Sequence, residues 1–251
     1  KETRNVSSSN GAYIMFTSGS TGFPKGALIS HSNLNNFINW TKDTFNIQPS
    51  DRSTNLNPLF FDNSVFDFYS SIFNGASLVI FQEEDLIHPK NLIKKIDSLR
   101  CTQWFSVPSL LIYVNTLKAF KVSNMKFMKK IIFGGEGYPK TKLKKLYELY
   151  SKRIKFHNVY GPTECTCMCS SYEIKDKDFK TLKGLPPLGK IADNFGYLIL
   201  DDDKPVKDNK EGELCLLGPC VGKGYYNDRA RTRKVFTQNP AHNLFQETIY
   251  R

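Results

Sequence analysis

The sequence predicts an α/β fold, with helices covering layers of parallel β-sheet, followed by a smaller antiparallel β subdomain. Short apolar segments alternate with amphipathic segments through the first two thirds of the 251 residues. Glycine-rich turns follow several apolar segments, at the strand ends where parallel sheets bind ligands. After residue 166, short strands alternate with turns, as in antiparallel structure. We therefore expect an α/β core over residues 1–166 and a mainly β subdomain over residues 167–251.

The first expected strand, at residues 13–16, ends in the loop TSGSTGFPKG, residues 17–26. Its three glycines and four hydroxyl side chains can bring donors close to an anion, and Lys25 adds a positive charge. Lys25 stands between Pro24 and Gly26, which differs from the phosphate loop of NTPases and argues against ordinary NTP hydrolysis. The loop is interpreted as phosphate-binding, and a plain surface loop of this composition is the alternative.

Periodicity and capping residues predict the remaining elements. The segment Ser30-His31-Ser32-Asn33 can cap a helix over residues 34–45. Helices are also expected at residues 89–100, at 108–118 and from 139 onward, and parallel strands at 77–81, 103–107, 130–133 and 155–160. In the β subdomain we expect strands at residues 167–172, 196–200 and 212–217.

Asp62 lies in an intensely aromatic stretch, residues 58–69. Burying a carboxylate among aromatic side chains is costly unless it meets a cation or several donors. Asp62 is therefore a candidate for holding a cationic ligand group. It could equally cap a helix over residues 66–73, and the residues alone leave both interpretations open.

The expected strand at residues 155–160 runs into Gly161-Pro162-Thr163-Glu164. This turn presents a hydroxyl and a carboxylate directly after Tyr160. An acid beside a phosphate loop is explained best by a divalent cation that bridges the two negative groups. A plain Gly-Pro turn is the alternative.

Composition excludes some function classes. The net charge of +11 and the pI of about 9.3 would suit nucleic acid, but the lysines are scattered or lie on amphipathic segments such as residues 139–150. We therefore expect a solvated basic face and no nucleic-acid partner. A nucleotide or an acidic protein would suit the same surface.

Cys165, Cys167 and Cys169 could suggest a metal site, yet the paired Cys-x-x-Cys spacing of zinc sites is missing. Their period-two spacing instead predicts structural cysteines on one face of a strand. No apolar run is long enough to cross a bilayer, and residues 1–10 lack the apolar region of a signal peptide. A cytoplasmic monomer with reduced thiols and no membrane partner is expected.

Four motifs together resemble those of the adenylate-forming superfamily, which includes acyl-CoA synthetases, luciferases and amino-acid adenylation domains. They are, in order along the chain, TSGSTGFPKG, FGGEG, NVYGPTE and GELCLLGPCVGKGYYND. The segment Phe61-Asp62-Asn63-Ser64 is similar to the F-D-x-S signature of amino-acid-activating members, whose aspartate binds the α-ammonium group. The sequence of these segments is most similar to that of D-alanine carrier-protein ligases and of nonribosomal peptide synthetase adenylation domains. The segments fit both subgroups.

The resemblance implies a role for each matching residue. Tyr160 would stack on adenine, Asn158 would bond its amino edge, Thr163 would touch the α-phosphate and Glu164 would hold Mg²⁺. Phosphate and nucleotide contacts are implied for Thr17, Ser18, Gly19, Ser20, Thr21, Gly22, Lys25, Gly135, Glu136 and Gly161, with Thr17, Lys25, Thr163 and Glu164 as the catalytic set. The implied amino-acid pocket contains Asp62, Asn63, Phe66, Ser106, Ile132, Gly134, Val159, Cys167 and Met168, and it suggests a small or medium neutral amino acid.

The implied reaction is ATP-dependent activation of an amino acid as aminoacyl-AMP with release of pyrophosphate. Thioester transfer to the phosphopantetheine of a carrier protein would follow in the intact protein. The ribose-binding Y-x-T-G-D motif would begin at Tyr250-Arg251, so the chain is expected to cover the middle of a larger enzyme and to be very weakly active alone. An acyl- or aryl-CoA synthetase, or a non-catalytic nucleotide-binding fragment, are the alternatives.

Overall fold

The computed structural model describes residues 5–17, 23–206 and 210–251. Two compact units make up the chain. One consists of Lys1–Trp40, Gly161–Cys169 and Ile191–Arg251, and the other of Thr41–Tyr160 and Ser170–Lys190. Each unit is thus built from segments that are distant in the sequence, and the expected division after residue 166 stays a proposal.

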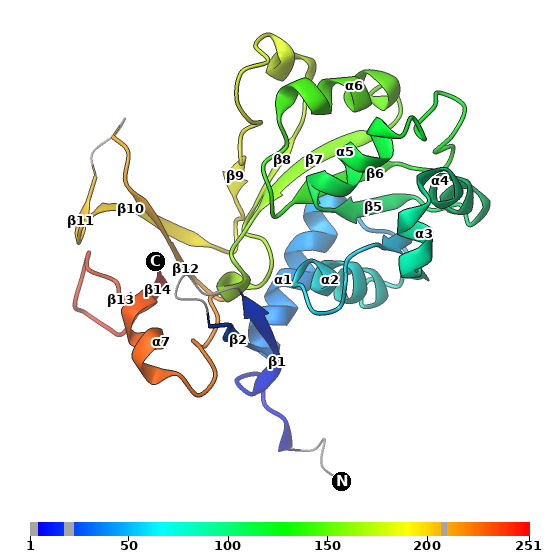
Figure 1. Cartoon of the computed structure of the whole chain (residues 1–251). Helices are drawn as coiled ribbons and strands as arrows, with labels where there is room; N and C mark the ends of the chain where they lie inside the picture. Colours follow the sequence, from blue (N-terminus) through cyan, green and yellow to red (C-terminus); the bar gives the residue numbers. More distant parts are fainter. Residues whose placement is uncertain (1–4, 18–22, 207–209) are drawn as a thin grey trace. The chain divides into compact units, whose positions relative to one another are not determined.

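A seven-stranded sheet organises the second unit (Figure 1). The strands β4, β3, β5, β6 and β7 run parallel, whereas β8 is antiparallel to β7. The predicted parallel sheet is therefore confirmed, with its carboxyl edge at the ends of β3, β5, β6 and β7. In sheet order the strands are β4 (Ser77–Ile80), β3 (Arg52–Asn55), β5 (Gln103–Ser106), β6 (Lys130–Gly134), β7 (Lys155–Tyr160), β8 (Ser170–Glu173) and β9 (Lys190–Ile191).

One face of this sheet is covered by helices α4 to α6, and Figure 1 shows α5 and α6 over β5, β6 and β7. Their apolar residues pack with alternate strand residues, such as Trp104 and Ile131, in one buried cluster. Proline occupies the first turn of α4 and α5, where its missing N–H leaves no intrahelical bond unmade. The helices are α3 (Glu83–Ile87), α4 (Pro89–Ser98), α5 (Pro108–Thr116) and α6 (Lys140–Tyr150).

Aromatic residues cover the opposite face. The Phe66 ring lies 5.0 Å from that of Phe105 and 5.4 Å from that of Phe45, centroid to centroid. Phe66 begins a short π-helix, η2 (Phe66–Ser70), which follows the single turn α2 (Asn63–Val65). The expected helix over residues 66–73 therefore starts earlier and is partly a π-helix, which brings Phe66 onto the sheet.

The first unit contains the hairpin of β1 (Gly11–Thr17) and β2 (Lys25–Ser30), followed by α1 (His31–Phe45), whose last turn belongs to the second unit. The Ser30 hydroxyl accepts a hydrogen bond from the Asn33 amide at 3.2 Å, so the predicted cap is present and the helix begins directly after Ser30. The unit also contains η3 (Thr163–Cys165) and α7 (Arg229–Val235); η4 (Asp176–Phe179) lies in the second unit.

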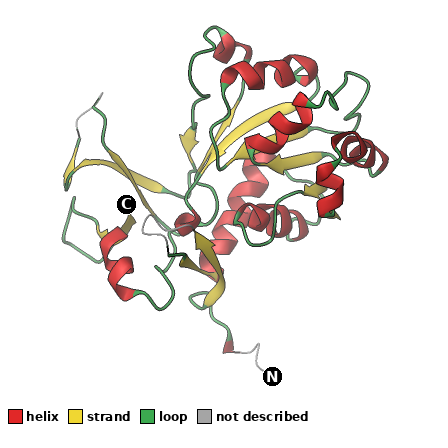
Figure 2. Ribbon diagram, viewed as in Figure 1, coloured by secondary structure: helices red, strands yellow, loops and turns green. Residues whose placement is uncertain are grey.

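A five-stranded antiparallel sheet completes the first unit, as predicted (Figure 2). Its small core consists of Leu200, Cys215 and Ile249, flanked by Leu198 and Leu217. In sheet order the strands are β11 (Lys204–Pro205), β10 (Gly196–Asp201), β12 (Glu213–Leu217), β14 (Thr248–Tyr250) and β13 (Phe236–Gln238).

The predicted strand through Cys165, Cys167 and Cys169 is wrong. Cys165 ends the 3₁₀ turn η3, and the next two residues, Thr166 and Cys167, have φ of 62° and 74°, outside the extended region of a regular strand. β8 therefore begins only at Ser170. All three cysteines are buried, and among the described residues no three His, Cys, Asp or Glu side chains form a group able to hold a metal ion. No helix in the described ranges is long and apolar enough to cross a membrane.

Candidate functional site

In the first unit, the segment at residues 222–226 runs alongside β2. Ala27 and Tyr225 form an antiparallel bridge, and the Leu28 amide donates to the Gly224 carbonyl at 2.9 Å. The Gly222 amide donates to the Glu164 carbonyl at 2.8 Å, which ties the same segment to η3. The backbone thus holds three segments together that are far apart in the sequence.

These backbone contacts bring Lys25, Tyr225 and Glu164 into one cluster. The Tyr225 hydroxyl donates to Glu164 Oε1 at 2.6 Å and accepts from Lys25 Nζ at 3.1 Å. Lys25 Nζ also lies 4.8 Å from the centre of the Tyr225 ring, within cation–π range. The Lys25 and Glu164 side chains are 21% and 6% exposed, and Lys25 Nζ lies 3.9 Å from Glu164 Oε1. A cation, a phenol and a buried carboxylate therefore share one partly closed site.

Two tyrosine hydroxyls surround the Glu164 carboxylate. Burial and the accepting Glu164 raise the pKa of Tyr225, so its hydroxyl stays protonated and donates. Burial and the negative charge of Glu164 also raise the pKa of Tyr250, at the end of β14. Sequence reasoning gave neither tyrosine a functional role, although Tyr225 lies in the quoted motif GELCLLGPCVGKGYYND. Only the tertiary structure reveals these contacts, because Tyr225 lies 200 residues from Lys25 and 61 from Glu164 in the sequence.

The turn before Glu164 is closely packed. A Cβ on Gly161 would lie 2.2 Å from Met168 Cα and 2.7 Å from the Cys167 carbonyl oxygen, so only glycine fits there. Cys167 and Met168 are buried, whereas Thr163 is half-buried. Among the predicted residues of this unit, Thr17 pairs with Lys25 where the two strands of the hairpin flank the loop. Ser18, Gly19, Ser20, Thr21 and Gly22 lie outside the described residues.

In the second unit, predicted residues gather at the carboxyl edge of the sheet. Gly135 has a φ of +83°, and its Cβ position lies 3.6 Å from both Asn63 Nδ2 and Val107 Cγ1. Glu136 accepts a hydrogen bond from the Ser109 amide at 3.2 Å, at the start of α5. The turn after β6 is therefore held between α2 and α5.

The predicted pocket residues divide between the two faces of the sheet. Ile132, Gly134 and Val159 lie on the face covered by Phe66, and a Cβ on Gly134 would lie 2.6 Å from Val159 Cγ2. Ser106, on the other face, is buried, and its hydroxyl accepts from the Trp104 indole at 2.7 Å.

Asn158 and Tyr160 end β7. The Asn158 amide donates to the Pro187 carbonyl at 2.8 Å, which fixes the side chain implied to meet adenine. Tyr160 is 38% exposed, so part of the residue that the resemblance assigns to adenine stacking is accessible.

Asp62 precedes α2 in a helical conformation and makes no side-chain capping hydrogen bond, so the capping interpretation is wrong. The side chain is half-buried.

Asp67, in the same aromatic stretch, is 1% exposed, and sequence reasoning assigned it no role. Its Oδ2 accepts from Asn57 Nδ2 at 2.9 Å and from Asn55 Nδ2 at 3.2 Å. Burial raises the pKa of Asp67 to about 7, despite the opposing hydrogen bonds from these two asparagines.

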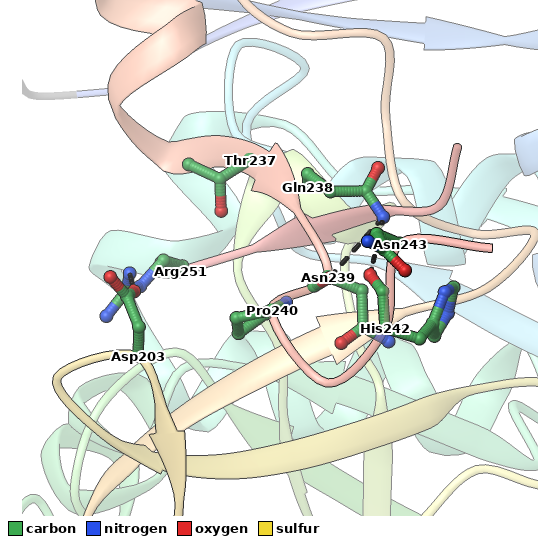
Figure 3. A pocket seen from close by; sticks show the side chains of 8 residues that line it. All are labelled: Asp203, Thr237, Gln238, Asn239, Pro240, His242, Asn243 and Arg251. Carbon is green, nitrogen blue, oxygen red and sulfur yellow. Dashed lines mark hydrogen bonds and ion pairs between the residues drawn. The ribbon is translucent and has the colours of Figure 1, made fainter. Parts of the chain in front are cut away.

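A separate pocket of about 650 Å³ lies in the first unit (Figure 3). The Arg251 guanidinium forms ion pairs with Asp203 Oδ1 at 2.7 Å and with Glu213 Oε2 at 2.9 Å. No predicted site residue lines this pocket, which is formed by Asp203, Thr237, Gln238, Asn239, Pro240, His242, Asn243 and Arg251.

Known proteins resemble this chain in sequence. A D-alanine–D-alanyl carrier protein ligase of Bacillus mycoides is 34% identical over 226 residues, which are 90% of this chain and 44% of the relative. The corresponding ligase of Bacillus cytotoxicus is also 34% identical over 226 residues. The chain therefore spans less than half the length of these curated relatives.

Solved structures agree in fold. The Vibrio cholerae adenylation domain AlmE, crystallised in complex with glycyl-adenosine-5'-phosphate, matches with a TM-score of 0.81 and 27% identity, over 98% of this chain and 45% of that one. The nonribosomal peptide synthetase FmoA3 matches with a TM-score of 0.81 and 25% identity, over 97% of this chain and 25% of that one. A family model described as AMP-binding enzyme matches residues 1–226. The chain accordingly belongs to the AMP-binding enzyme family, the adenylate-forming ligases.

Proposed function

We propose that this chain is part of a ligase that activates an amino acid as aminoacyl-AMP and releases pyrophosphate. The observation that carries the proposal is the convergence of Lys25, Tyr225 and Glu164 at the end of the β1–β2 hairpin. A lysine and a buried carboxylate beside a loop rich in donors suit a polyphosphate and its cation.

The residues present fit Mg²⁺, which adenylate-forming enzymes use in general together with ATP. Mg²⁺ is usually held by one or two carboxylates with water and substrate phosphates, not by an all-protein cage. Glu164 supplies one such carboxylate, and its two oxygens offer about four acceptor positions, more than the tyrosine hydroxyls use. When bound, the ion would neutralise phosphate charge at Glu164.

The chain's own residues would position the reactants. Lys25 and the loop after Thr17 would bind the β- and γ-phosphates, and Thr163 would contact the α-phosphate. Tyr160 would offer its exposed ring to the base, and the substrate carboxylate would attack the α-phosphorus. Positioning and charge complementarity supply most of the rate enhancement in such transfers.

Asp62 supports an amino acid as substrate. Asp62 is half-buried and lies in a sequence stretch rich in aromatic residues, where an α-ammonium group would be a fitting counter-charge. The relatives named as D-alanine–D-alanyl carrier protein ligases, and AlmE with its glycyl-adenosine-5'-phosphate, favour a small amino acid. We further propose transfer to a phosphopantetheinyl carrier protein in the cytoplasm, and very weak activity of residues 1–251 alone.

Amino-acid-dependent exchange of pyrophosphate into ATP by the full-length protein tests the proposal. Exchange with a small amino acid is expected, and replacement of Asp62 by alanine should raise the amino-acid KM at least tenfold while the ATP KM changes little. Asp43→Ala, at an exposed position of α1, is the matched control. Exchange supported only by fatty or aryl acids would indicate an acyl- or aryl-CoA synthetase. Nucleotide binding by the full-length protein without any exchange would indicate a non-catalytic nucleotide-binding protein.

A further inference from the structure

The separation of Lys25 and Glu164 is unusual for two opposite charges in a partly buried site. Direct charge-assisted hydrogen bonds between an ammonium and a carboxylate measure roughly 2.7–2.9 Å. Lys25 Nζ instead lies 3.9 Å from Glu164 Oε1, and the Tyr225 hydroxyl bonds to both atoms. The hydroxyl therefore takes the place of a direct ion pair.

Tyr225 is itself rigidly held. Its backbone pairs with Ala27, its amide donates to the Thr232 hydroxyl at 2.8 Å, and its ring packs edge-on against Phe236 at 5.7 Å between centroids. Because backbone and ring are anchored independently of the hydroxyl, the hydroxyl's place is determined by the fold and not by the two charges.

We propose that Tyr225 is a positioning residue that keeps the Lys25 ammonium and the Glu164 carboxylate from collapsing onto each other, so that each stays available to bound nucleotide. The inference rests on the proposed function. The hydroxyl occupies one ammonium donor and one carboxylate lone pair, as a direct pair would, but it is neutral and therefore leaves both charges to attract the phosphates and the cation. In this role Tyr225 acts through these two side chains.

Tyr225→Phe removes the hydroxyl and keeps the ring that packs on Phe236. In a crystal structure of the nucleotide-free variant, Lys25 Nζ is expected to move about 1 Å and to contact Glu164 directly at hydrogen-bonding distance. If the distance between Lys25 Nζ and Glu164 Oε1 stays near 3.9 Å in this variant, the proposal is overturned.

Calorimetric titration with Mg·ATP gives the functional readout. Loss of a group that orients a metal ligand typically costs roughly 10–100-fold in affinity, and we expect a loss in this range for Tyr225→Phe with an unchanged unfolding midpoint. Tyr226→Phe makes the same chemical change one residue further on, at a side chain 54% exposed, and should alter the affinity less than twofold. Equal losses in both variants, or none in Tyr225→Phe, would refute the role.

The proposed function and the spacing role of Tyr225 can be tested separately. If the wild-type protein shows no pyrophosphate exchange and binds no Mg·ATP, the spacing role is still decided by the nucleotide-free structure of Tyr225→Phe. If that variant does not fold, a structure of the wild-type chain with Mg·ATP decides: the Tyr225 hydroxyl should remain on Glu164 Oε1 while Lys25 turns to the phosphates. A hydroxyl that leaves Glu164 there would overturn the proposal.

Discussion

Replacing Asp67 by asparagine is expected to stabilise the protein above pH 7. The carboxyl is fully buried, and burial raises its pKa from 3.8 to about 7. A shift of about 3 pKa units at about 1.4 kcal/mol each corresponds to about 4 kcal/mol against the ionised form. This cost develops between pH 4 and 7, because the unfolded chain ionises first, and it is complete above pH 7.

Asparagine keeps the acceptor for Asn57 and Asn55 but adds an amide group. Asp67 Oδ1 is buried without a hydrogen-bond partner among the described residues, so an N–H at that position loses about 1–3 kcal/mol. The net gain for Asp67→Asn at pH 8 is therefore about 1–3 kcal/mol. Below pH 4 the wild-type carboxyl is neutral in both states and only the amide penalty remains, so the variant should there be less stable than the wild type by about 1–3 kcal/mol.

Urea unfolding of both proteins from pH 4 to 9 measures this difference. The comparison must be made at each pH, because burial also lowers the pKa of His157 to about 4, which destabilises both proteins as the pH falls from about 6.5. The reasoning is wrong if Asp67→Asn has a lower free energy of unfolding than the wild type at pH 8. It is also wrong if the difference in unfolding free energy does not change with pH.

Asp51→Asn is the matched control, since Asp51 is equally buried but ion-paired. Burial opposes its ionisation, yet hydrogen bonds from the Gln48 amide and Lys129 outweigh burial and lower its pKa. The stabilisation of the folded state by the ionised Asp51 carboxylate is present above pH 4 and is lost on further acidification. Asp51→Asn should therefore destabilise the protein at pH 8, by about 3 kcal/mol or more, opposite in sign to Asp67→Asn.

Two further predictions concern packing and thiols. Gly161→Ala places a methyl group 2.2 Å from Met168 Cα and should lower the free energy of urea unfolding by about 3 kcal/mol or more; a loss below about 1 kcal/mol would mean that the turn relaxes. Burial raises the pKa of Cys220 to about 12 and that of Cys165 well above its usual value. Both thiols should resist a disulfide reagent at pH 8 in the native protein and react in urea, and rapid native labelling by mass spectrometry would contradict their burial.

Local patterns in the sequence predicted much of the fold. Apolar residues at helical spacing located α4, α5 and α6, and short β-rich runs located β5, β6 and β7, because these periods reflect contacts between neighbouring residues. The strand expected through Cys165 and Cys167 failed for a non-local reason. The close approach of Gly161 to Met168 accompanies a left-handed backbone at Thr166 and Cys167, which period-two spacing cannot reveal.

The sequence by itself determined the order of the motifs, the glycine- and hydroxyl-rich composition of the loop before Lys25, and the presence of an acid at Asp62 and Glu164. Only the tertiary structure decided that Tyr225 stands between Lys25 and Glu164 and that Asp67 is the acid buried deepest in the aromatic stretch. The physical reason is that capping and periodicity act over a few residues. A hydroxyl 200 residues from its partner meets it only when β2 pairs with the segment at residues 222–226.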